Sequence, residues 1–310
     1  MNGSYSSSAT EFLLLGLSED PKIKIVLFIV FLPIYMVTVI GNVILVTACI
    51  IDPKLHTPMY FFLSNLSFVD IFYSSAILPN MLVQLLVKRK ISFIACGIQM
   101  FTYLLLGSTE CVLLAVMSYD RYVAITFPLN YANIMRKSVC TFMVVFSWLN
   151  GSLMSFLGTM GALKLPLCGH YVIDHFFCES TAFAKIACGD TYVSEMINFI
   201  GGVIVLLIPV FFILFTYIRI IITIIRIPSS TGRHKAFSTC ASHLIVVTIF
   251  FSTTISMYMK PVSEKTVNED KVISVFYTVM PSMLNPLIYS LRNKDVKVAL
   301  KKLMRWNGSH

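Results

Sequence analysis

The sequence is poor in charge. Only 13% of its 310 residues are Asp, Glu, Lys or Arg, against about 25% in soluble globular domains. At the same time 57% of the residues are hydrophobic. The net charge of +9 is divided among short segments between apolar stretches, which argues against nucleic-acid binding. The composition predicts an integral membrane protein.

Three further features are lacking, and each excludes a class of protein or a segment. No half-chain repeat is visible, which argues against a transporter, although intramembrane Asp70 with Glu110 favours one. The apolar stretches contain no constellation of metal ligands or nucleophiles, so an enzyme is not expected. Residues 1–24 lack a basic start followed by a short apolar run, so no removable signal peptide is expected.

The chain does contain apolar stretches long enough to cross a bilayer. They cover residues 25–50, 58–87, 93–119, 139–163, 196–218, 237–259 and 272–291. Pro79, Pro281 and Pro286 interrupt two of them and should kink these helices rather than end them. We therefore predict an all-α membrane protein, a seven-transmembrane helix bundle over 25–291, with an N-terminal tail (1–24) and a C-terminal tail (292–310) on opposite sides.

The charges and the glycosylation motifs predict the orientation. Most Lys and Arg fall on the inner side if the amino end is extracellular and the carboxyl end cytoplasmic. Lys88, Arg89 and Lys90 argue the other way. Asn2-Gly3-Ser4 is the topologically usable glycosylation acceptor, which supports an extracellular amino end. The basic cytoplasmic rim should favour anionic lipid and an acidic partner surface.

The cysteines divide by compartment under this orientation. Cys96, Cys168, Cys178 and Cys188 fall outside, where disulfides form. Four outer cysteines allow three pairings. His170 and His175 with Cys178 could instead hold a soft metal ion. The remaining cysteines should stay reduced, namely Cys49, Cys111, Cys140 and Cys240.

The third span carries charged groups that need compensation. Its end reads MSYDRYVAI (117–125), where Arg121 either extends to water or is held by a carboxylate such as Asp120. Glu110 and Asp70 each cost about 2.5–3.5 kcal/mol at a helix centre unless paired, protonated or hydrated. Helical spacing places Tyr103, Gly107, Glu110, Leu114, Met117 and Arg121 on one face.

Five strings in order carry a family resemblance, together with Gly41-Asn42. They are PMYFFLSNLSFVDI (58–71), MSYDRYVAI (117–125), HFFCE (175–179), KAFSTCASHL (235–244) and PSMLNPLIYSLRNK (281–294). Over nearly its whole length the chain resembles the odorant (olfactory) receptors, which are rhodopsin-like (class A) G-protein-coupled receptors. It departs from the family at Thr126, where Cys is usual, and at Phe250-Phe251-Ser252, where Phe-Tyr-Gly is usual. The missing hydroxyl at Phe251 puts in doubt the hydrogen bond that the family's Tyr would make near the pocket floor.

The resemblance implies roles for several groups of residues. The activation switch would consist of Asp120, Arg121, Tyr217, Asn285, Pro286 and Tyr289. Asn42, Asp70 and Asn285 would form an intramembrane polar cluster that Glu110 joins; it would be either a sodium or proton site, or a purely hydrogen-bonded, partly protonated cluster. The implied disulfides are Cys96–Cys178 and Cys168–Cys188, which pin the second outer loop over the pocket. Arg233, His234 and Lys235 would flank the opening for a G-protein helix, and residues 293–305 would form a short interfacial helix with Val296, Leu300 and Leu303 on one face.

The outer halves of the third, fifth, sixth and seventh spans contain no Asp, Glu, Lys or Arg, so a charged ligand would lack a counter-charge. Pocket candidates by helical face and family position are Tyr103, Leu104, Gly107, Ser108, Cys111, Asn198, Gly202, Val205, Phe251, Thr254, Ile255, Tyr258 and Thr278. This lining suits a small neutral volatile. The resemblance implies an odorant receptor in the plasma membrane of olfactory cilia that activates a stimulatory olfactory-type G protein and raises cyclic AMP. The alternative is a receptor of this family for a metabolite outside the olfactory epithelium.

Overall fold

The computed structural model describes residues 11–87, 90–167, 171–258, 267–292 and 296–299. Several predicted features lie outside these residues: the glycosylation acceptor Asn2, Cys168 and His170 of the outer loop, and Leu300 and Leu303 of the proposed interfacial helix. Val296 is described and is buried.

Seven helices among the described residues are long and apolar enough to cross a membrane, which confirms the predicted fold class. The first four are α1 (Pro21–Ile51), α2 (Pro58–Leu86), α3 (Phe93–Thr126) and α5 (Lys137–Leu163). The fifth span is continuous over α7 (Tyr192–Gly202), a π-helical turn η2 (Val203–Leu207) and α8 (Ile208–Ile225). The last two are α9 (Ser230–Tyr258) and α10 (Val267–Arg292).

Local sequence signals explain where these helices begin. Asp20 caps α1 by accepting a hydrogen bond from the Lys22 backbone N–H at 2.8 Å, and Ser92 caps α3 through the Ala95 N–H at 3.1 Å. Pro21 and Pro58 occupy first turns, where the missing N–H costs nothing. Pro79, Pro281 and Pro286 lie inside α2 and α10, so these helices continue past their prolines as the sequence predicts.

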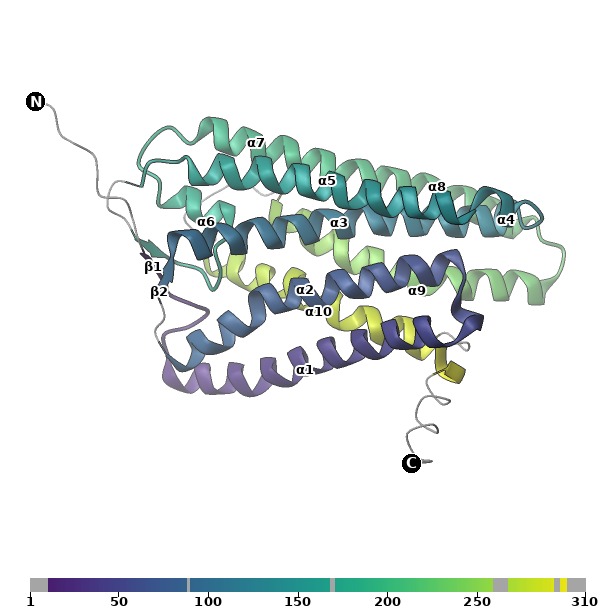
Figure 1. Ribbon diagram of the computed structural model, residues 1–310, viewed down its shortest axis with the longest axis horizontal. Coiled ribbons are helices and arrows are strands. Elements are labelled where there is room, and N and C mark those ends of the chain that lie inside the picture. Colours follow the sequence, from purple (N-terminus) through teal and green to yellow (C-terminus); the bar gives the residue numbers. More distant parts are fainter. Residues whose placement is uncertain (1–10, 88–89, 168–170, 259–266, 293–295, 300–310) are drawn as a thin grey trace, which may run out of the picture.

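The helices differ in how much of their surface other helices cover. The most apolar window of α3 is 61% buried, whereas that of α1 is 11% buried. Figure 1 shows the same arrangement, with α3 running through the middle of the bundle and α1 along its lower edge. The exposed residues of α1 are largely Ile, Val and Leu. Such a surface is stable against hydrocarbon and not against water.

The two ends of the bundle carry different short elements. A three-stranded sheet of order β2-β1-β3 covers one end, built from β1 (Glu11–Leu14), β2 (Lys90–Ser92) and β3 (Val172–Ile173). Strand β1 pairs antiparallel with β2 and parallel with β3. The short helix α6 (Ser180–Lys185) lies at this sheet end, and α4 (Tyr131–Ile134) lies at the opposite end, the α4 end (Figure 1). A 3-10 turn, η1 (Pro53–Leu55), joins α1 to α2.

Candidate functional site

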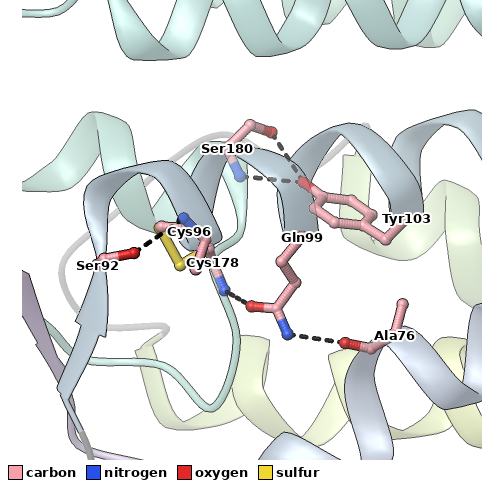
Figure 2. The surroundings of a disulfide bond; sticks show 8 residues. Ala76, Ser92, Cys96, Gln99, Tyr103, Cys178 and Ser180 are labelled. Atoms are coloured by element: carbon pink, nitrogen blue, oxygen red, sulfur yellow. Dashed lines mark hydrogen bonds between the residues drawn. A yellow bond between two sulfur atoms is a disulfide. The ribbon is translucent and has the colours of Figure 1, made fainter.

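A disulfide fastens the loop between β3 and α6 to α3. Cys96 and Cys178 are joined with their Cα atoms 5.4 Å apart, which confirms this predicted pairing. Gln99, one turn further along α3, accepts a hydrogen bond from the Cys178 backbone N–H at 3.0 Å and donates one to the Ala76 carbonyl of α2 at 2.9 Å. Figure 2 shows Gln99 between the loop and α2, so one side chain ties the loop to two spans.

The same loop is held to the bundle further along. The Ser180 backbone N–H donates to the Tyr103 hydroxyl at 3.0 Å (Figure 2). The Tyr277 hydroxyl of α10 donates to the Glu179 carboxylate at 3.2 Å, and that carboxylate is fully buried. The sequence offered no sign of this contact beyond the HFFCE string, because Glu179 and Tyr277 are far apart in the chain. The loop thus brings a carboxylate next to the bundle that no span supplies.

His175 belongs to this buried loop and is neutral. Burial, helped by the positive charges of Lys271 and Lys185, lowers the pKa of His175 to about 3. Its Nε2 lies 3.1 Å from a Glu179 carboxylate oxygen, whose negative charge favours the protonated ring and so opposes the lowering of the pKa. The two atoms do not have the geometry of a hydrogen bond. Burial therefore dominates. The alternative of a soft-metal site at His170, His175 and Cys178 finds no support, since the Cys178 sulfur is in the disulfide and His170 lies outside the described residues.

A cavity of about 260 Å³ lies beneath this loop, between α3, α5, the fifth span, α9 and α10. Many of the pocket residues predicted from the sequence line it. These are Tyr103, Leu104, Gly107, Ser108, Cys111, Asn198, Gly202, Val205 and Thr254. The cavity is also lined by residues that the sequence did not single out. These are Tyr73, Met154, Leu157, Gly158, Ser180, Ile197, Ile200, Gly201, Ile204, Leu206, Phe250 and Tyr277.

Other predicted pocket residues are not brought to the cavity. Phe251 and Ile255 of α9 do not line it; their neighbours Phe250 and Thr254 do, because the face of α9 that meets the cavity differs by one residue from the expected one. Thr278 is buried elsewhere, with its hydroxyl donated to the Ser274 carbonyl. The side chain of Tyr258 lies outside the described part of the chain.

None of the described residues that line the cavity carries a charged side chain. Its polar groups are the hydroxyls of Tyr73, Tyr103, Ser108, Ser180, Thr254 and Tyr277 and the amide of Asn198. Several hydroxyls already have partners: Thr254 donates to the Phe250 carbonyl at 2.7 Å. Such a cavity can fix one neutral oxygen of a ligand by hydrogen bonds and select the remainder by shape.

The predicted intramembrane cluster lies between α1, α2, α3 and α10. Asn285 donates to a carboxylate oxygen of Asp70 at 2.9 Å, while Asn42 donates to the Thr38 and Ser282 carbonyls, each at 3.0 Å. One oxygen on each of five residues in or near this cluster is buried and has no hydrogen-bond partner among the described residues. These residues are Asn42, Ser67, Asp70, Glu110 and Asn285.

At the α4 end, Asp120 of the MSYDRYVAI string is paired with a residue other than Arg121, the partner that the sequence suggested. Asp120 accepts a hydrogen bond from the Tyr131 hydroxyl of α4 at 2.6 Å. Within the described part of the chain no ion pair joins it to Arg121, whose Nε has no hydrogen-bond partner there. The reason is geometric, since neighbours in a helix point to different faces.

Two other predicted switch residues, Tyr217 and Tyr289, lie near Arg121, whereas Asn285 belongs to the cluster around Asp70. The Tyr217 hydroxyl lies 2.7 Å from Nδ1 of His243 on α9, and Nε2 of His243 lies 3.2 Å from the Leu114 carbonyl of α3. His243 is fully buried and links three spans. The sequence shows it only as part of the KAFSTCASHL string. The Tyr289 hydroxyl is buried and has no partner among the described residues.

Comparisons with known proteins agree with this geometry. The family model described as "Olfactory receptor" matches residues 31–306. Olfactory receptor 2D2 of Homo sapiens is 51% identical over 302 residues, covering 97% of each chain. Olfactory receptor-like protein OLF3 of Canis lupus familiaris is 48% identical over 295 residues, covering 95% of this chain and 93% of that one.

Squid rhodopsin has the same fold, with a TM-score of 0.73 at 20% identity over 93% of this chain and 87% of its own. The family places the protein in the plasma membrane as a multi-pass signalling receptor for small molecules, not an enzyme, with a G protein as partner. The chain belongs to the olfactory receptor family.

Proposed function

We propose that this receptor binds small neutral volatile ligands in the 260 Å³ cavity and activates a stimulatory olfactory-type G protein, which raises cyclic AMP. The sheet end would be extracellular and the α4 end cytoplasmic. The observation that carries the ligand class is the lining, which among the described residues is apolar with a few hydroxyls and one amide and has no charged side chain. Burying an ionic ligand there without a counter-charge would be strongly unfavourable.

The size of the cavity supports a small ligand. Cavities for drug-sized ligands typically measure about 300–1,000 Å³, so a cavity of 260 Å³ lies just below this range. A ligand of about ten heavy atoms, at roughly 0.4–0.8 kcal/mol per atom, binds in the micromolar to millimolar range. We therefore expect weak, broad recognition, in which a single hydrogen bond contributes a large share of the affinity.

The route from ligand to G protein would use the α4 end. Arg121, Tyr217 and Tyr289 lie on three different spans there, and the Tyr217–His243 contact couples α8 to α9. Arg233 and His234, on the first turns of α9, are exposed. An outward movement of α9 would break the Tyr217–His243 contact and open a basic-rimmed groove for a G-protein helix.

We also propose that the Asp70–Glu110 cluster holds either a sodium ion or a proton. Four of its five unpartnered oxygens are amide or carboxyl oxygens and the fifth is the Ser67 hydroxyl, and the charges of Asp70 and Glu110 repel each other. Two buried carboxylates need a cation, a proton or water between them. Asn42, Ser67, Asp70, Glu110 and Asn285 would supply oxygen ligands, which hard cations prefer.

The experiment is a cyclic AMP assay in cells that express the receptor with an olfactory-type G protein, screened against neutral volatiles. Thr254→Val removes a hydroxyl that lines the cavity; Thr278→Val removes a matched buried hydroxyl that does not. Because the Thr254 hydroxyl already donates to the Phe250 carbonyl, it can accept a hydrogen bond from an alcohol. We expect Thr254→Val to weaken the response to an alcohol agonist about tenfold, the value of one lost hydrogen bond of roughly 1.4 kcal/mol, and Thr278→Val to leave it unchanged.

A third variant tests the switch. Arg121→Ala should abolish signalling at normal surface delivery. Equal effects of the two threonine variants, or potent activation by a permanently charged amine, would contradict the neutral-ligand proposal. A response that depends on a different G protein would contradict the coupling but not the cavity.

A further inference from the structure

The wall of the cavity at the sheet end is closed by buried loop residues. Ser180 lines the cavity and is 1% exposed, and Cys178 and Glu179 beside it are 0% exposed. The disulfide and the Tyr103–Ser180 contact fasten this segment to α3. A ligand arriving from that side would have to displace the fastened loop.

The line along which α5 packs against the fifth span, here called the seam, leaves no gap near the sheet end. Gly158 and Gly161 of α5 face α7 there. A Cβ atom added at Gly158 would lie 3.7 Å from Asn198 Oδ1, and one added at Gly161 would lie 3.5 Å from Ile197 Cδ1. These are ordinary contact distances, so at this level no more than the width of one methyl group separates the two helices.

One helical turn further along α7 the seam is open. A Cβ atom added at Gly201 would find no heavy atom within 4 Å, although Gly201 lines the cavity. Three large apolar residues around this point also line the cavity while facing outwards: Leu157 is 45% exposed, Ile200 is 50% exposed and Ile204 is 36% exposed. The same side chains therefore border both the cavity and the outer surface of the bundle.

The π-helical turn η2 starts at this level. It places Ile204 on the exposed side and Val205 and Leu206 on the buried side, and all three line the cavity. A π-turn inserts an additional residue into a helix and is frequent at functional sites. Here it lets one stretch of the fifth span form both the inner wall and the rim of the gap.

We propose that ligands enter the cavity from the membrane, through a portal between α5 and the fifth span bordered by Leu157, Ile200, Gly201 and Ile204. The portal is entirely apolar, so it admits neutral compounds that partition into the hydrocarbon phase and excludes charged ones. This inference rests on the proposed ligand cavity, but its test needs no agonist. It adds a second level of selection, because the ligand's concentration in the bilayer determines how fast the cavity fills.

The test uses Cys111, a thiol that lines the cavity. The full-length receptor in lipid nanodiscs is treated with benzyl methanethiosulfonate, which is uncharged and lipophilic, or with the trimethylammonium-ethyl reagent, which carries a permanent charge. Each forms a mixed disulfide with the thiol and releases methanesulfinate. Mass spectrometry of the peptide that carries Cys111 gives the labelling rate, divided by the rate of each reagent with free glutathione.

We expect the uncharged reagent to label Cys111 about tenfold faster than the charged one. Gly201→Trp, which places a large ring in the open space, should slow the uncharged reagent about tenfold, a barrier increase of roughly 1.4 kcal/mol. Gly201→Leu, a smaller change, should slow it less. The matched control is Ile208→Trp, about two turns further along the fifth span at a residue that is 59% exposed and does not line the cavity; it should label like the wild type.

Three results would overturn the proposal: equal rates for the two reagents, an undiminished rate in both Gly201 variants, or a Cys111 that is labelled only after denaturation. Failure of the proposed function has a different signature. A receptor that is silent in the cyclic AMP assay while Cys111 labelling follows the expected pattern would keep the portal and lose the signalling proposal.

Discussion

Gly151 of α5 offers a sharp test of how closely α3 and α5 pack. A Cβ atom added there would lie 2.2 Å from Thr109 Oγ1 and 2.7 Å from the Leu105 carbonyl oxygen of α3. The Thr109 side chain can rotate away, but the Leu105 oxygen is backbone. To restore an ordinary contact of 3.4 Å, the helices would have to separate locally by about 0.7 Å.

The matched control is Gly201→Ala, where the added methyl group meets nothing within 4 Å. Both changes replace Gly by Ala inside a helix, so the gain in helix propensity, about 1 kcal/mol, is common to the two variants. Their difference in unfolding free energy then measures the steric conflict alone. Overpacking of a tight core costs about 1–3 kcal/mol, and we expect Gly151→Ala to be less stable than Gly201→Ala by that amount.

The measurement is the thermal midpoint of the purified receptor, followed by the reaction of buried cysteines with a thiol-reactive dye as they become exposed. Surface delivery in cells should fall in parallel for Gly151→Ala. Midpoints for Gly151→Ala that equal or exceed those for Gly201→Ala would show that α3 and α5 are not in the described contact, and would refute the reasoning.

Three other predictions concern the loop and the switch. Cys96→Ser should cost about 2–4 kcal/mol of stability by releasing the loop, seen as a lower thermal midpoint that reductant lowers by less than it lowers the wild-type midpoint; Cys49→Ser, at a free cysteine, should leave the full sensitivity to reductant intact. Tyr217→Phe leaves Nδ1 of buried His243 without its 2.7 Å partner, so the midpoint should fall by the equivalent of about 1–3 kcal/mol; an unchanged midpoint would argue against this contact. Lowering the pH from 6.5 towards 3 should destabilise the receptor by up to about 1.4 kcal/mol per pH unit. In this range His175 of the unfolded chain, with its ordinary pKa of 6.5, binds a proton, whereas His175 of the folded receptor, with a pKa of about 3, does not. His175→Gln should reduce this slope, and an identical slope in that variant would contradict the assignment.

The sequence alone determined the number of spans, their approximate bounds and the disulfide to Cys96. Apolar stretches of about 20 residues have few alternatives to crossing a membrane as helices, because lipid satisfies no backbone hydrogen bond. Prolines at the starts of α1 and α2 and inside α2 and α10 acted as their chemistry requires. The motif strings then identified the family, and with it the pairing of Cys96 with Cys178.

Only the tertiary structure decided which residues meet. It gave Asp120 the Tyr131 hydroxyl as partner, connected Glu179 to Tyr277 and placed His243 between three spans. It also brought Leu157 of α5 to the cavity and took Thr278 away from it. The physical reason is that lipid-facing and core-facing residues of a membrane helix are both apolar, so the sequence pattern does not reveal which face turns inward. That choice depends on close contacts such as Gly151 against α3, which exist only once the helices have packed.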